Sequence, residues 1–592
     1  MESGKGRERL CYVLFDERTQ DLMSPMVRNL PSHLKKYVAS QHFDSYTPEE
    51  HATWRYLLRQ LKAYLKDTAH PCYLDGLEKT GVREDRIPKI SEMDELLQKF
   101  GWGAVPVSGF IPPAAFMEFQ SLGILPIASD MRSIGHMLYT PAPDIVHEAA
   151  GHAPILIHPE YAAYLKSYAQ VAKKAIISRE DLNQYEAIRK LSDIKEHPHS
   201  TKEDIEKAEA HLDATNKSMT YISEASLLSR MNWWTAEYGL IGDLKHPQIY
   251  GAGLLSSLGE SRDCLKDHVR KIPLSVDCVD VSYDITEPQP QLFVTPNFEH
   301  LQVVLEDLAQ RLSFRKGGIY GLNEALRAKS VNTVELDSGL QISAILESFK
   351  SKDDHVSFLK FSGPSQLSLS GQQLEGHGKD FHAHGYSTPL GPLSGLEKPL
   401  NALAESERKS LGLEIGKSVD LKFSSGIQLK GSVKNLRVHK DQLILITLDH
   451  ARMTLGEELL FDPDWGTFDL ACGNKVTSVF GGPADREAYG EVEDFVAERV
   501  PSKNPSDNQI KLFTFYDQVR KIREKNQIAQ EEISGLWNQF QSLPEKTWLA
   551  GYEVLELAHL KGFKDFANEI EPVLRSEFAR YENKITDGLR LI

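Results

Sequence analysis

The sequence predicts a multidomain protein in three parts: a mainly α-helical part over 1–330, a small antiparallel β domain over 331–485 and a helical region over 486–592. Three observations support this division. The chain has 592 residues, and a single hydrophobic core is usually smaller than that, so two to four domains are expected. Apolar residues recur at helical spacing in the first and last parts. In the middle part they alternate with polar residues, as in half-buried strands.

The first part is predicted to contain amphipathic helices. Apolar residues recur every three to four positions over 50–69, 161–176, 222–240 and 298–312. The last of these segments follows Pro296, and proline is tolerated near the start of a helix. Residues 178–217 are rich in Glu, Lys, Asp and His and have few large apolar side chains. That composition predicts a solvated helical hairpin.

The β domain is predicted from alternating segments at 334–349, 356–374 and 418–448, with turn signals between short runs. A further β-like stretch covers 461–480. Several short strands separated by turns are typical of a sandwich or a barrel. Helical periodicity then returns and predicts a tail of four helices, over 513–522, 533–540, 548–560 and 566–581.

One segment of the β domain invites interpretation as a metal site. It runs Gly376-His377-Gly-Lys-Asp-Phe-His382-Ala-His384-Gly. Its glycines and its lack of a regular period favour a flexible loop, which is our prediction. We find no ligand triad, phosphate loop or nucleophile motif in 331–592. This half is therefore predicted to be an interaction or regulatory module, and the sequence does not identify its protein partner.

Composition excludes several classes of protein. The 68 basic and 84 acidic residues give a net charge of −16, which argues against a nucleic-acid or anionic membrane surface. No apolar run approaches the roughly 18 residues that span a bilayer. No apolar segment of the secretory type follows Met1. The five cysteines form no CxxC pairs, so a reducing cytoplasm is the expected location.

The strongest candidate for chemistry is the segment from Pro141 to Pro154, Pro-Ala-Pro-Asp-Ile-Val-His147-Glu148-Ala-Ala-Gly-His152-Ala-Pro. Imidazoles and carboxylates are the usual ligands of divalent transition metals. Side chains five residues apart diverge by roughly 140° on an α-helix. Both rings can therefore reach one ion only at a helix end or an irregularity, which Gly151 and the prolines make plausible. A third ligand must come from elsewhere, and Glu237 in Asn-Trp-Trp-Thr-Ala-Glu is the best candidate.

Two reactions fit such a ligand set. Two histidines and a carboxylate bind one face of a metal and leave positions open, which suits Fe(II) that activates O₂. Zinc would instead serve hydrolysis, with a metal-bound water and Glu148 as general base. The ligand residues alone leave both possibilities open.

Further motifs, which follow one another in a fixed order, narrow the choice between these two reactions. They are Tyr46-Thr-Pro-Glu-Glu-His-Ala-Thr-Trp-Arg-Tyr, Ile90-Ser-Glu-Met-Asp-Glu, Phe100-Gly-Trp, Val107-Ser-Gly-Phe-Ile-Pro-Pro and Tyr250-Gly-Ala-Gly-Leu-Leu-Ser-Ser. Together with the two ligand segments, these motifs show that residues from about 25 to 315 resemble the pterin-dependent aromatic amino acid hydroxylases. Within this family, the resemblance is strongest to the bacterial phenylalanine hydroxylases. The resemblance implies this family's catalytic fold for 1–330. The segment 178–217 is longer than the family usually has at this position, so we interpret it as a surface insertion.

The resemblance also implies roles for individual residues. It makes His147, His152 and Glu237 the ligands of Fe(II). It makes Arg132 the partner of the substrate carboxylate, and the surrounding substrate-binding positions are Thr140, Pro143, Asp144, Trp233, Ser256 and Ile285. A branched alkyl group at Ile285 offers a phenol no hydrogen-bond partner, which favours phenylalanine over tyrosine.

For the cofactor, the resemblance implies tetrahydrobiopterin or a related tetrahydropterin. Phe116 matches the stacking ring, Gly109, Phe110 and Ile111 match the backbone contacts, and Glu148 approaches the pterin. The expected reaction is the O₂-dependent hydroxylation of L-phenylalanine to L-tyrosine. The alternatives are a tyrosine or tryptophan hydroxylase and, less favoured, a metal-dependent hydrolase.

Overall fold

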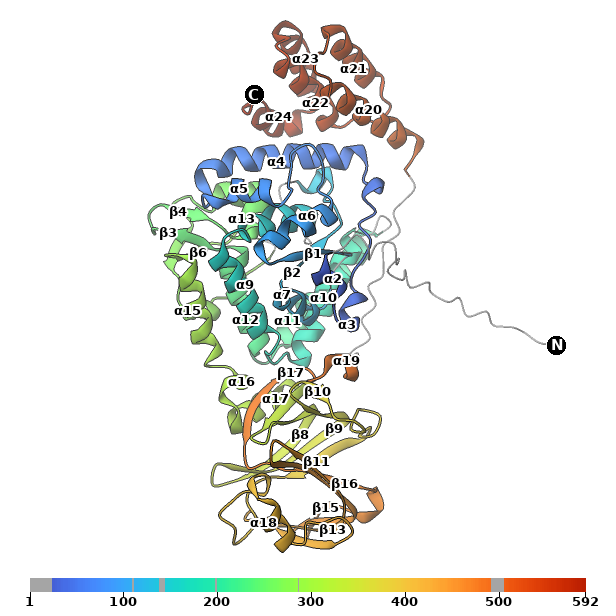
Figure 1. Ribbon diagram of the computed structural model, residues 1–592. Coiled ribbons are helices and arrows are strands. Elements are labelled where there is room, and N and C mark those ends of the chain that lie inside the picture. Colours follow the sequence, from blue (N-terminus) through green and yellow to red (C-terminus); the bar gives the residue numbers. More distant parts are fainter. Residues whose placement is uncertain (1–23, 109–110, 138–143, 197–199, 286, 491–504) are drawn as a thin grey trace, which may run out of the picture.

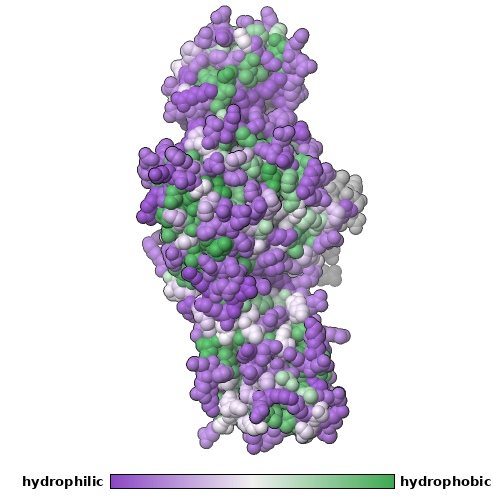
Figure 2. All heavy atoms as spheres, turned by 60° about the vertical axis from the view of Figure 1, so that its left-hand side comes forward, coloured by the Kyte–Doolittle hydropathy of each residue, from purple (hydrophilic) through white to green (hydrophobic). Residues whose placement is uncertain are grey.

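The computed structural model describes residues 24–108, 111–137, 144–196, 200–285, 287–490 and 505–592. Figure 1 shows an elongated molecule in which the first part lies between the C-terminal helices and the β domain. Hydrophilic residues cover much of the face in Figure 2, and the apolar patches among them are interrupted. No helix in the described ranges is long and apolar enough to cross a membrane.

The first part is mainly helical, as predicted. Its helices are α2 (Pro25–Arg28), α3 (Ser32–Lys35), α4 (Pro48–Thr68), α5 (Cys72–Lys79), α6 (Ile90–Leu97), α7 (Pro113–Ser121), α8 (Ala153–Ile155), α9 (Pro159–Ala172), α10 (Arg179–Glu196), α11 (Lys202–Ser218), α12 (Glu224–Asn232), α13 (Ala252–Ser256), α14 (Leu258–Asp263) and α15 (Phe298–Ala309). Thr47 and Glu50 form a capping box that fixes the start of α4.

Two small sheets complete the first part. Strands β1 (Gly103–Val107) and β2 (Ile124–Ala128) are parallel, with Gly103 opposite Ile124. The second sheet has the order β4-β3-β6-β5, and its strands are β3 (Leu240–Gly242), β4 (Pro247–Ile249), β5 (Arg270–Pro273) and β6 (Gln291–Thr295). These strands were not predicted, because each is only three to five residues long and gives little periodicity.

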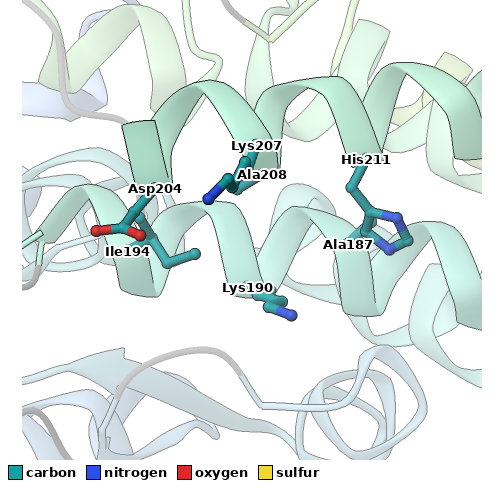
Figure 3. Close-up of a pocket in the computed structure, with 7 residues that line it drawn as sticks. All are labelled: Ala187, Lys190, Ile194, Asp204, Lys207, Ala208 and His211. Carbon is teal, nitrogen blue, oxygen red and sulfur yellow. The ribbon is translucent and has the colours of Figure 1, made fainter. Parts of the chain in front are cut away.

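The predicted hairpin over 178–217 is present as α10 packed on α11. Thr201 and Asp204 form a capping box at the start of α11. A hollow of about 240 Å³ lies between the two helices (Figure 3). It is lined by Ala187, Lys190, Ile194, Asp204, Lys207, Ala208 and His211, and none of the predicted site residues is among them. The hollow gives no support for a binding site.

The β domain contains two antiparallel sheets, as predicted for this region. The first has the order β10-β9-β8-β7-β17, with β11 paired to β9. Its strands are β7 (Val331–Leu336), β8 (Leu340–Lys352), β9 (His355–Leu369), β10 (Gln372–Gln373), β11 (Gly385–Pro389) and β17 (Val476–Gly481). The second has the order β12-β13-β14-β15, with β16 paired to β14. Its strands are β12 (Ser418–Lys422), β13 (Ile427–His439), β14 (Gln442–Leu455), β15 (Glu458–Phe461) and β16 (Phe468–Ala471).

Helices α16 (Ser313–Lys316) and α17 (Gly318–Ala328) lie against β17. Leu322 and Ala325 of α17 belong to the same buried cluster as Val334 and Ile342 of the first sheet. The core of the β domain therefore begins upstream of residue 330, because α17 covers the sheet. The short helices α18 (Glu405–Ser410) and α19 (Arg486–Tyr489) are the remaining helices of this domain.

Over its described residues 505–592, the C-terminal region has five α-helices where four were predicted: α20 (Asp507–Arg523), α21 (Gln530–Ser542), α22 (Trp548–Leu560), α23 (Lys564–Glu577) and α24 (Glu582–Leu589). They cover α4 (Figure 1), and their buried side chains form one continuous core with those of the first part. Tyr56 of α4 packs edge-on against Trp548 and Tyr552, with ring centroids 5.1 and 5.5 Å away. Arg55 and Arg59 form ion pairs with Glu556, whose side chain is fully buried.

Candidate active site

The two predicted histidines lie on a π-helical turn, His147–His152, which continues into α8. In a π-helix the backbone hydrogen bond joins residues five apart, so a side chain and the fifth one after it face the same side. The two imidazole rings accordingly meet edge to face, with centroids 4.9 Å apart. The predicted irregularity is confirmed, and it brings both rings to one point.

Glu237 ends a second π-helical turn, Trp233–Glu237, and its carboxylate lies between the two histidines. Its Oε2 is 3.2 Å from Nε2 of His147, and its Oε1 is 3.2 Å from Nε2 of His152. Burial alone would raise the pKa of Glu237, but the neighbouring rings of His152 and His147 outweigh burial and hold this pKa well below its usual range. Asn232 Nδ2 donates to Oε1 of Glu237 at 3.4 Å.

The hydrogen bonds around His147 fix which of its nitrogens is free. The hydroxyl of Ser256 donates to the carbonyl oxygen of Ala252 at 2.7 Å. It therefore accepts from Nδ1–H of His147, 3.1 Å away. This leaves Nε2 of His147 unprotonated and directed at Glu237, which is the form that binds a metal.

Asp144 connects His147 to Arg132. Its carboxylate accepts two bonds of 2.7 Å from Nε and Nη2 of Arg132, and also accepts from the backbone N–H of His147 at 3.1 Å. Nη1 of Arg132 donates to the carbonyl oxygen of Ser256 at 3.2 Å. Arg132 and Asp144 are both buried, so the guanidinium is held as a fixed fork. Asp144 and Ser256 thus lie beside Arg132, where the resemblance implied they would be.

Glycines allow the two segments that carry the predicted ligands to pack closely against residues 251 and 252. A Cβ at Gly151 would lie 2.6 Å from the carbonyl oxygen of Ala252, and a Cβ at Gly251 would lie 2.5 Å from that of Glu237. Neither position can carry a larger side chain without moving the backbone. The motif that begins at Tyr250 therefore packs directly on both ligand segments.

Glu148 is a second carboxylate near the histidines. Its ligand atom lies within 4.8 Å of theirs, a looser arrangement than the 3.2 Å contacts of Glu237. Burial raises the pKa of Glu148 to about 8, and Oε2 has no hydrogen-bond partner. The geometry therefore favours Glu237 over Glu148 as the third ligand.

The predicted substrate slot is only partly described. Thr140 and Pro143 lie outside the described residues. Ile285 is 37% exposed. The ring of Trp233 is stacked between Tyr283 and Tyr238, with centroids 4.3 and 4.4 Å away. Both faces of this indole are covered, so only its edge is available to a substrate.

Of the predicted pterin contacts, Gly109 and Phe110 lie outside the described residues. Ile111 is buried, and Phe116 is partly buried on α7. Tyr185 of α10 was not predicted to take part, but its hydroxyl donates to the carbonyl oxygen of Ile111 at 2.8 Å. The sequence carried no signal for this contact, because the two residues are 74 positions apart and Tyr185 lies in the charged hairpin.

The two carboxylate oxygens of Glu237 each lie 3.2 Å from Nε2 of one histidine, so the three side chains are close enough to share an ion at bond lengths of about 2.0–2.2 Å. Two imidazoles and a carboxylate that meet at one point are donors that a divalent transition metal prefers.

Comparison with known proteins defines the family. A family model described as biopterin-dependent aromatic amino acid hydroxylase matches residues 33–186 and 213–356. The chain belongs to this family. The unmatched residues 187–212 fall within the α10–α11 hairpin.

Relatives that are named for an enzymatic activity are similar to the same half of the chain. The phenylalanine-4-hydroxylase of Pseudomonas aeruginosa is 30% identical over 283 residues, covering 46% of this chain and 90% of that protein. The enzyme of Chromobacterium violaceum is 27% identical over 285 residues, covering 46% and 81%. A crystal structure of the Chromobacterium violaceum enzyme with iron(III) and 7,8-dihydrobiopterin covers 49% of this chain and 91% of that one, at 25% identity and a TM-score of 0.37.

Proposed function

We propose that this protein hydroxylates L-phenylalanine to L-tyrosine, using O₂ and a tetrahydropterin, at an Fe(II) held by His147, His152 and Glu237. The observation that carries the proposal is the position of the Glu237 carboxylate, 3.2 Å from Nε2 of each histidine. Family membership and the phenylalanine-4-hydroxylase relatives support the reaction. Fe(II) and the tetrahydropterin, when bound, supply the oxygen activation that no side chain can provide.

The protein's own residues hold the metal ligands and the substrate. Ser256 keeps the proton of His147 on Nδ1, and Asp144 holds both the His147 backbone and the Arg132 guanidinium. Arg132 is assigned to the substrate carboxylate, because a planar guanidinium binds carboxylates with two parallel bonds. Since the backbone carbonyl of Ser256 also accepts from Arg132, the substrate and metal positions share one rigid frame.

Other residues are assigned to selectivity and to the cofactor. We assign Thr140, Pro143, Trp233 and Ile285 to recognition of the aromatic ring. Phe116 stacks on the pterin, Gly109, Phe110 and Ile111 bind its edge, and Glu148 contacts it from beside His147. We place the protein in the cytoplasm, because the cysteines in the described part are all free.

The test is amino-acid analysis of the full chain reconstituted with Fe(II) and tetrahydrobiopterin and supplied with phenylalanine, tyrosine or tryptophan. We expect tyrosine to form from phenylalanine, with O₂ consumed in equal amount. Glu237→Gln should lose the iron and the turnover together. Preferred turnover of tyrosine or tryptophan would reassign the substrate, and zinc-dependent hydrolysis without O₂ uptake would contradict the proposal.

A further inference from the structure

A second cluster of metal-ligand side chains lies in the β domain, in the segment interpreted above as a flexible loop. His377 and His382 lie between β10 and β11, and Asp469 lies on β16. Their exposures are 7%, 9% and 3%, so all three are buried. Nδ1 of His377 is 3.3 Å from Nε2 of His382, and these atoms are 3.7 and 3.9 Å from Oδ2 of Asp469. The segment is a loop between two strands, as predicted, but the rings of these two histidines pack into the domain.

Hydrogen bonds hold the histidine segment in place. The carbonyl oxygen of His377 accepts from Leu367 N–H at 2.9 Å, and that of His382 accepts from Ser365 N–H at 3.0 Å. Both donors belong to β9, a central strand of the first sheet. By contrast, the side chain of His384 in the same segment is exposed and lies outside the cluster.

The carboxylate of Asp469 is oriented toward the histidines and lacks a donor there. Its Oδ1 accepts from the Thr447 hydroxyl at 2.7 Å. Its Oδ2 is buried and has no hydrogen-bond partner. Distances of 3.7 and 3.9 Å are too long for hydrogen bonds from the imidazoles. A buried carboxylate oxygen without a donor is strongly unfavourable, and a cation between the three groups would satisfy it.

The spacing suits a transition metal of the zinc type. Ligand atoms at about 2.0–2.1 Å around a tetrahedral zinc ion lie about 3.3–3.5 Å from one another. The observed 3.3 to 3.9 Å needs only a small inward movement of Asp469. The cluster has no fourth His, Cys, Asp or Glu within the described residues, so a solvent molecule would complete the coordination.

We propose that His377, His382 and Asp469 bind one zinc ion, separate from the catalytic iron. The ion joins the two sheets, because the histidine segment is bonded to β9 of the first sheet and Asp469 belongs to β16 of the second. It acts as a cross-link in the β domain and takes no part in the hydroxylation. The earlier expectation of no ligand triad in 331–592 is corrected by this cluster.

The experiment measures metal content and zinc affinity of the full chain. Protein freed of metal and reloaded with Fe(II) and Zn²⁺ is analysed by mass spectrometry, and zinc affinity is measured against a chromophoric chelator. We expect one zinc per chain beyond the catalytic iron. His377→Gln and Asp469→Asn should lose this zinc, with affinity at least about 100-fold weaker, and keep the iron and the hydroxylation. His384→Gln, the matched control, should bind zinc like the parent chain.

Two further measurements keep the proposal testable if a ligand variant fails to fold. Thr447→Val removes only the bond that orients Asp469 and should weaken zinc binding by about 10- to 100-fold. Zinc should also raise the melting temperature of the parent chain and of His384→Gln. Absence of a second metal equivalent in the parent chain, or its persistence in His377→Gln and Asp469→Asn, would overturn the proposal. Iron in place of zinc at this position would overturn the choice of ion.

Discussion

The hydroxyl of Ser256 lies 3.1 Å from Nδ1 of His147 and donates its own hydrogen to the carbonyl oxygen of Ala252. Serine at this position therefore contacts the histidine, in addition to the substrate-binding role that the resemblance implied. Because Ser256 also accepts from Arg132 through its backbone, one residue supports both the proposed metal ligand and the proposed substrate anchor.

Replacement of this hydroxyl should weaken the metal site. In Ser256→Ala, His147 loses the bond that selects its tautomer, and loss of such an orienting bond typically costs 10- to 100-fold in metal affinity or activity. We expect iron affinity to fall by about that factor. Equilibrium dialysis with Fe(II) measures it, with Ser257→Ala on the neighbouring residue as control. Unchanged iron affinity in Ser256→Ala would contradict the assigned tautomer.

Replacement of the substrate anchor should act on phenylalanine alone. Arg132→Lys keeps the positive charge but loses the planar fork that Asp144 holds. Loss of a buried charged contact to a ligand costs about 2–5 kcal/mol, so the KM for phenylalanine should rise at least about 30-fold. Steady-state kinetics with iron analysis checks this. An unchanged KM with normal iron content would remove Arg132 from the substrate site.

The contact between the hairpin and the predicted pterin loop should affect the cofactor. In Tyr185→Phe the carbonyl of Ile111 loses its 2.8 Å bond, worth about 0.5–1.5 kcal/mol. The KM for tetrahydropterin should rise about 2- to 10-fold, with little change in the KM for phenylalanine. Gln184→Ala is the control, because Gln184 bonds Asn216 inside the hairpin. Equal effects of the two variants would point to a general disturbance of the hairpin.

Acid stability should depend on His51. Burial, with Arg520 and Arg86 nearby, lowers the pKa of this buried histidine to about 4, and its Nδ1 accepts from Ile87 N–H at 3.2 Å. Because the folded pKa lies below the unfolded value of 6.5, the stabilisation is complete above pH 6.5 and is lost as the pH falls toward 4. The largest loss is about 3 kcal/mol.

Urea unfolding at pH 7 and pH 4.5, followed by tryptophan fluorescence, tests this. His51→Gln keeps an acceptor but cannot be protonated, so its free energy of unfolding should fall by about 2 kcal/mol less than that of the parent chain over this range. The exposed His246→Gln should behave like the parent. A parallel fall in His51→Gln would show that His51 does not control acid stability.

The contact between the C-terminal helices and α4 should depend on Glu556. This fully buried carboxylate pairs with Arg55, Arg59 and Arg523, and loss of one partner from a buried ion pair costs about 3–5 kcal/mol. Glu556→Gln should therefore make the amides of α20–α24 exchange faster with deuterium. Lys546→Ala, which breaks a more exposed pair with Glu577, should cost less than about 1 kcal/mol. Equal exchange in both variants would contradict this account.

Local patterns could be predicted from the sequence, and contacts between distant segments could not. His147 and His152 share one short motif, and the mismatch of their five-residue spacing with an α-helix pointed to the irregularity that the π-helical turn provides. Asp469, in contrast, comes after nearly all of the second sheet in the sequence, and the packing of β16 beside β11 brings it near the histidines. The glycines around His377 concealed a buried site, because composition does not reveal where a ring points.

In the helical regions too, the sequence predicted local elements and did not predict contacts between distant segments. The period of α22 identified it as a helix, but both its faces are buried, and its covering of α4 depends on Tyr56, Arg55 and Arg59 near the other end of the chain. The eight-residue α24 was missed because it offers only about two turns of periodicity.

The pairing of Arg55 with Glu553 spans 498 positions of the sequence, and this has a consequence during synthesis. At about 5–20 residues per second, a ribosome needs roughly 25–100 s to produce the second partner after the first. During that interval α4 presents Tyr56 and two arginines without the helices that later cover them. The nascent chain is therefore open to chaperones at α4 until translation is nearly finished, and a stalled ribosome leaves a protein whose first long helix is uncovered.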